Sequence, residues 1–97
     1  MQELLKDIKY LSSKEKKTLE QMVLKLTEEI GETSQAMLSY KQASGSEYKH
    51  LDIADVKEEC ADVILVALSL FYKLCENEAE LEEYLEKKVA KWKSVMS

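Results

Sequence analysis

The sequence predicts an all-α protein, a single domain over residues 1–97 built as a four-helix bundle that oligomerisation completes. Three observations lead to this prediction. Proline is absent and only two glycines occur among the 97 residues, so few positions break a helix. Apolar residues recur at helical spacing along the chain. One segment is apolar nearly all the way round, which a domain this small cannot cover alone.

Two helices are expected in the first half of the chain. The first runs from about Gln2 to Tyr10. Ser12 followed by Glu15 has the form of a capping box, which would begin a second helix from about Ser13 to Tyr40. The apolar stripe of this second helix consists of Leu19, Met22, Val23, Leu26, Ile30 and Met37.

Two further helices follow a polar segment that interrupts the periodicity. Either Asp52 or Asp55 could cap the third helix, which continues to about Cys75. Asn77 and Glu80 have the spacing of another capping box, which would open the fourth helix. The apolar side of that helix consists of Leu81, Leu85, Val89, Trp92 and Met96, so Trp92 is expected in the core.

The third helix reads VILVALSLF after Asp62 and has no polar face there. One face of this helix can pack into the core of its own chain, and the opposite face must be buried against something else. A second copy of the chain supplies that cover by symmetric association, so we expect a homodimer or homotetramer. A helix enclosed entirely by the three others of the same chain is the alternative.

Charge and composition narrow the classes of partner. The net charge is −5 and lysines alternate with glutamates, so we expect no nucleic-acid partner. No apolar run approaches the roughly 20 residues that span a bilayer, and we expect no membrane association. Cys60 and Cys75 are expected to be buried, reduced thiols, and the charged start of the chain is unlike a signal sequence, which together predict a cytoplasmic protein.

Two acidic pairs, Glu29 with Glu32 and Glu59 with Asp62, are expected to form a metal site. Spacing alone is weak support, because other acids three residues apart occur in this chain. At about 100° per residue, Glu29 lies roughly 60° from the centre of the apolar stripe on its helix, and Glu59 about 70° from the centre on its own. Each pair therefore begins at the rim of a buried face.

The two pairs also match in register. If the helices pack antiparallel about a turn near Gly45, Glu32 faces Glu59 and Glu29 faces Asp62. Four converging carboxylates repel one another unless a cation neutralises them, and all-oxygen ligands favour Mg²⁺, with Mn²⁺ possible. A solvated acidic face with no metal is the alternative.

These residues carry a resemblance to a known family. The segments LTEEIGETSQAML and VKEECADVILVAL resemble the E-x-x-E and E-x-x-D motifs of the MazG-like branch of the all-alpha nucleoside triphosphate pyrophosphohydrolases, and 26 residues separate Glu32 from Glu59 as in that pattern. The resemblance implies a MazG-like bundle that cleaves a nucleoside triphosphate between the α and β phosphates. It implies Glu29, Glu32, Glu59 and Asp62 as metal ligands, with Glu29 or Glu32 as the catalytic base.

The last helix departs from that family. Lys88 and Lys91 could bind phosphate as the resemblance implies, or could be exposed lysines flanking Trp92, which stands where the family has asparagine. No arginine occurs in the chain. Lys25, one turn before Glu29, is either its salt-bridge partner or a further substrate contact. A non-catalytic helical adaptor and a nucleotide or cation-binding regulator remain the alternative functions.

Overall fold

A computed structural model describes residues 1–41 and 52–97, and the turn expected near Gly45 lies outside these residues. The described chain is all-helical and contains no strand, which confirms the all-α part of the prediction. Its four helices are α1 (Gln2–Ser13), α2 (Leu19–Tyr40), α3 (Ile53–Leu74) and α4 (Glu80–Met96).

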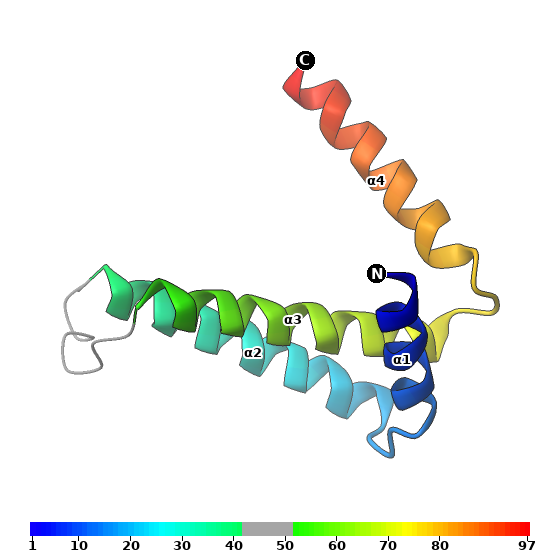
Figure 1. The fold of residues 1–97 in the computed structure, drawn as a ribbon, viewed down its shortest axis with the longest axis horizontal. Helices are drawn as coiled ribbons and strands as arrows, with labels where there is room; N and C mark the ends of the chain where they lie inside the picture. Colours follow the sequence, from blue (N-terminus) through cyan, green and yellow to red (C-terminus); the bar gives the residue numbers. More distant parts are fainter. Residues whose placement is uncertain (42–51) are drawn as a thin grey trace.

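The centre of the fold is a hairpin in which α2 and α3 run antiparallel along their whole length (Figure 1). The short helix α1 packs across the Leu74 end of α3. The helix α4 leaves from that same end and extends away from the hairpin. Among the described residues, α2 with α3 and α1 with α3 form the principal helix contacts.

The start of α2 differs from the prediction. Thr18 is its N-cap, and its hydroxyl oxygen accepts a hydrogen bond from the backbone N–H of Gln21 at 3.1 Å. The Gln21 side chain accepts from the Thr18 N–H at 2.9 Å, which completes a capping box. Ser12 instead lies within α1, which is longer than expected, and donates its hydroxyl proton to the carbonyl of Ser69 at 2.7 Å. A tertiary bond therefore uses the hydroxyl that the prediction assigned to a cap.

The later helix starts agree more closely with the sequence. Asp52 caps α3, and Asp55 completes a capping box by accepting a hydrogen bond from the Asp52 N–H at 2.9 Å. At α4 only half of the expected box forms. Glu80 accepts from the N–H of Asn77 at 2.8 Å, whereas the Asn77 side chain accepts from the N–H of Ala79 at 2.9 Å. The carboxylate of Glu80 therefore holds the incoming turn against the first residue of the helix.

The buried face of α2 is rotated relative to the predicted stripe. Met22, Glu29 and Ala36, spaced seven residues apart, are buried against α3, whereas Ile30 and Met37 are half exposed. At about 100° per residue, this packed face is centred on Glu29 and lies roughly 60° round the helix from the predicted centre. Glu29 thus lies in the seam between the two helices and not at its rim.

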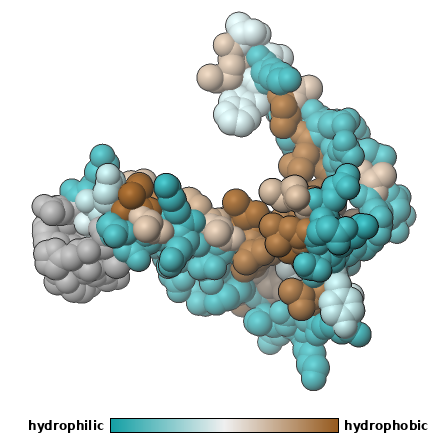
Figure 2. All heavy atoms as spheres, in the orientation of Figure 1, coloured by the Kyte–Doolittle hydropathy of each residue, from teal (hydrophilic) through white to brown (hydrophobic). Residues whose placement is uncertain are grey.

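Much apolar surface is left uncovered in the single chain. Apolar side chains gather along the hairpin and along the side of α4 that faces the opening between them (Figure 2). Trp92, expected in the core, is 67% exposed, and Cys60, expected to be buried, is exposed as well. Within residues 1–41 and 52–97, no helix has the combined length and apolarity required to cross a membrane.

Candidate metal centre

Two acidic side chains occupy positions in the α2–α3 seam that coiled helices normally give to apolar residues. Glu29 lies seven residues from both Met22 and Ala36 on α2, and its side chain is 7% exposed. Glu59 on α3 is half-buried and lies three residues after the buried Val56. Burying a carboxylate costs free energy unless a partner compensates its charge.

The hairpin brings three of the predicted ligands together. Carboxylate oxygens of Glu29, Glu59 and Asp62 lie within 4.8 Å of one another, with one residue supplied by α2 and two by α3. Glu32 joins a second group with Glu28 and Glu29, whose oxygens also lie within 4.8 Å of one another. Glu29 belongs to both groups, so the five acids form one continuous cluster.

Two oxygens of this cluster lack the partners that burial normally requires. Within the described part of the chain, Oε2 of Glu29 and Oε2 of Glu59 are buried side-chain oxygens without a hydrogen-bond partner. Buried polar atoms are nearly always hydrogen-bonded, and an exception calls for a specific explanation. A cation bound between α2 and α3 would satisfy both oxygens and reduce the repulsion among the carboxylates.

Lys25 compensates part of the negative charge. Its ammonium nitrogen lies 2.9 Å from Oε1 of Glu29 and 3.2 Å from Oε1 of Glu28, one turn further along α2. The hydrogen bond to Glu29, and then the one to Glu28, raises the pKa of Lys25 above its usual value. Of the two readings of Lys25 from the sequence, the structure shows the salt bridge.

Neighbouring carboxylates change the pKa of Glu32. The nearby negative charge of Glu29 raises the pKa of Glu32 above 4.5, and partial desolvation and the negative charges of Glu59 and Glu28 add to the effect. The side chain is nevertheless exposed at the edge of the seam. Glu32 is therefore an accessible carboxylate that takes up a proton more readily than an ordinary glutamate.

The donor set fits a hard divalent cation. Among the residues that the structure describes, the groups that converge are carboxylates, with no histidine and no thiolate in either group. Oxygen-only sites suit Mg²⁺ and Mn²⁺, because both ions prefer carboxylate and water ligands. Glu29, Glu59 and Asp62 would hold the ion from both sides of the seam, and the exposed Asp62 leaves its outer face open.

The sequence interpretation missed Glu28. It is not among the predicted ligands, and 58% of its side chain is exposed. Its carboxylate nevertheless lies within 4.8 Å of those of Glu29 and Glu32 and within hydrogen-bond distance of Lys25. The seven-residue spacing of Met22, Glu29 and Ala36 is the signal that would have indicated the correct face.

Lys88 and Lys91 are not brought to the acidic cluster within one chain. Both are exposed on α4, which extends away from the hairpin. A contact between either lysine and a ligand at the cluster therefore requires a second chain or a different position of α4.

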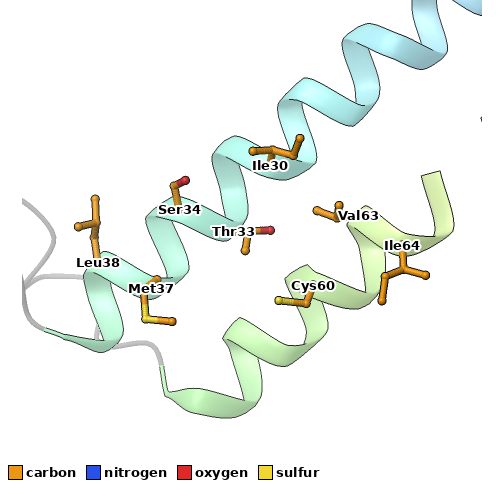
Figure 3. Close-up of a pocket in the computed structure, with 8 residues that line it drawn as sticks. All are labelled: Ile30, Thr33, Ser34, Met37, Leu38, Cys60, Val63 and Ile64. Atoms are coloured by element: carbon orange, nitrogen blue, oxygen red, sulfur yellow. The ribbon is translucent and has the colours of Figure 1, made fainter. Parts of the chain in front are cut away.

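An apolar groove lies beside the acids. Its lining residues are Ile30, Thr33, Ser34, Met37, Leu38, Cys60, Val63 and Ile64. In Figure 3, Thr33 and Met37 of α2 and Cys60 and Val63 of α3 point toward the opposite helix. Four lining residues directly follow an acid of the cluster in sequence: Ile30, Thr33, Cys60 and Val63. Consecutive helical residues project about 100° apart, so the groove and the acids occupy neighbouring faces of the hairpin.

Comparisons with known proteins returned no match: no family model, curated protein or solved structure is detectably similar to this chain.

Proposed function

We propose that this protein is a magnesium-dependent nucleoside triphosphate pyrophosphohydrolase, which cleaves between the α and β phosphates to give a nucleoside monophosphate and pyrophosphate. The observation that supports this most directly is the pair of buried oxygens on Glu29 and Glu59, which have no partner in the described part of the chain and lie in a shared seam. They lie in the two segments whose motifs resemble the MazG-like family. Mn²⁺ could replace Mg²⁺ at a site of this chemistry.

The cluster offers distinct roles to its members. Glu29, Glu59 and Asp62 would hold the ion, which when bound neutralises phosphate charge and makes a water molecule more acidic. Glu32 is the better catalytic base of the two acids considered, because it is exposed and its pKa is raised. Glu29 is less suited, since Lys25 pairs with one of its oxygens and the other is buried.

We also propose that the working form is a homodimer or homotetramer. A folded monomer of 11.2 kDa exposes about 5,700 Å² on average, whereas this chain exposes 7661 Å². The excess of roughly 2,000 Å² is more than the ~800 Å² that each partner buries in a stable interface. The apolar groove beside the acids supplies a surface for the second copy, which would then border the metal site.

Product analysis tests the proposed activity. The protein is incubated with Mg²⁺ and a panel of ribonucleoside and deoxyribonucleoside triphosphates, and the products are separated by ion-exchange chromatography. We expect monophosphate and pyrophosphate in equal amounts from at least one nucleotide. Diphosphate and free phosphate would contradict the proposed bond cleavage. Absence of turnover with every nucleotide, together with Mg²⁺ binding, would support the regulator instead.

A further inference from the structure

The two groups of acids share Glu29 but differ in how their charge is balanced. In the group of Glu28, Glu29 and Glu32, the ammonium of Lys25 bridges two carboxylates, at 3.2 Å from Glu28 and 2.9 Å from Glu29. In the group of Glu29, Glu59 and Asp62, two oxygens are buried without a partner among residues 1–41 and 52–97. Within these residues, one group therefore contains a positive charge from the chain itself, and the other does not.

We propose that the ammonium of Lys25 takes the place of a second divalent cation, so that each chain binds one divalent ion at Glu29, Glu59 and Asp62 and none at Glu28, Glu29 and Glu32. This inference rests on the metal site of the proposed function. It adds that the group of Glu28, Glu29 and Glu32 is a latent cation site, which can bind a divalent ion once the charge of residue 25 is removed.

The helix fixes this arrangement. Lys25 precedes Glu28 by three residues and Glu29 by four, and side chains at both spacings are neighbours on a helix surface. The ammonium contacts Oε1 of both glutamates and so neutralises one oxygen of each. Such an ion would sit about 2.1 Å from its oxygen ligands, so it would lie close to the ammonium and be repelled by it.

The side chain of Glu29 indicates that the remaining group is a binding site. It is 7% exposed, and its Oε1 pairs with Lys25 while its Oε2 lacks a partner among the described residues. One carboxylate thus has one oxygen neutralised by the chain and one buried oxygen available to an ion. Lys25 is a positioning residue in this arrangement, because it holds Glu29 by one oxygen and leaves the other free.

Counting bound Mn²⁺ tests the proposal. Free Mn²⁺ is measured by electron paramagnetic resonance during titration of the folded protein. We expect one Mn²⁺ per chain for the wild type and two for Lys25→Met, whose side chain has similar length and no charge. Lys25→Arg, which keeps the positive charge, should bind one Mn²⁺ per chain, as the wild type does. Lys17→Met is the matched control, because Lys17 pairs with Glu15 outside the cluster and its loss should leave the count at one.

A double variant locates the added ion. Lys25→Met with Glu28→Gln removes a carboxylate of the latent site only, so the count should fall from two back to one. Lys25→Gln replaces Lys25→Met if circular dichroism shows that the latter does not fold. One bound Mn²⁺ per chain in Lys25→Met or Lys25→Gln, or two in the wild type, would overturn the role of Lys25. Either result would leave the proposed activity intact. A wild type that binds no Mn²⁺ would instead contradict the metal site itself.

Discussion

The ammonium of Lys25 lies 2.9 Å from Oε1 of Glu29, whose Oε2 is buried and unpartnered among the described residues. A single carboxylate in the helix seam therefore has two different environments. An apolar residue at position 29 would pack as Met22 and Ala36 do. The acid is a local conflict between packing and charge, and such conflicts concentrate at functional sites.

Replacement of Glu29 by leucine should separate stability from metal binding. The change removes a buried charge and its repulsion from Glu59 and Asp62, while Lys25 keeps Glu28 as a partner. We expect the free energy of unfolding without metal to rise by about 1 kcal/mol in urea titrations. The same variant should lose the response of its melting temperature to Mg²⁺. A less stable variant that still responds to Mg²⁺ would show that Glu29 is a structural residue.

Mg²⁺ should stabilise the wild-type protein against heat. An ion that binds only the folded state adds about 2.7 kcal/mol at 100 times its dissociation constant, so the melting temperature should rise with the logarithm of the Mg²⁺ concentration. Glu59→Gln should abolish the rise, because its Oε2 is one of the buried oxygens. Glu58→Gln, an exposed neighbour of the same type, is the control and should leave the rise unchanged. Equal rises in both variants would place the ion elsewhere.

The raised pKa of Glu32 predicts a pH dependence of stability without metal. A carboxyl whose pKa is higher in the folded state contributes stability at low pH, and this contribution is lost as the pH rises through the folded-state pKa. In EDTA, Glu32→Gln should therefore melt at a higher temperature than the wild type at pH 7. The difference should shrink as the pH approaches 4.5, the ordinary value for glutamate. A difference independent of pH would mean that charge repulsion is not its cause.

Self-association should depend on the apolar groove. Ile30 lines it and is 51% exposed in the single chain, so Ile30→Asp should place a charge in the interface and shift the protein to monomers in sedimentation velocity. Leu24 is 69% exposed on the same helix but does not line the groove. Leu24→Asp should leave the assembly intact. A wild type that sediments as a monomer at high concentration would contradict the proposed oligomer.

Much of the fold was predictable from local sequence signals. The order of four helices and a cap at Asp52 or Asp55 follow from short-range patterns, which act within one or two helical turns, and the structure selects Asp52. Ser12 is an instructive failure, because its hydroxyl can satisfy either a helix start or a distant carbonyl. Its partner, Ser69, is 57 residues away, and no local pattern contains that information.

The sequence predicted which residues form the acidic cluster better than it predicted how they are arranged. The register that pairs Glu29 with Asp62 follows from an antiparallel hairpin, and the structure places both in one group. The burial of Glu29 was underestimated because α2 has two faces that can pack. Periodicity identified an apolar face that includes Ile30 and Met37, whereas the chain packs a neighbouring face, on which Met22 of that stripe lies with Glu29 and Ala36. Periodicity does not indicate whether a face packs within a chain or against another copy.

The release of pyrophosphate by the wild type, Glu59→Gln and Glu58→Gln tests the central claim most directly. The three proteins are compared at saturating Mg²⁺ on the nucleotide that the wild type hydrolyses fastest, with circular dichroism as the check on folding. We predict that Glu59→Gln loses at least 100-fold in kcat/KM, about 2.7 kcal/mol of transition-state stabilisation, while Glu58→Gln stays near the wild type. Pyrophosphate release by Glu59→Gln at the wild-type rate would contradict a metal centre in the α2–α3 seam.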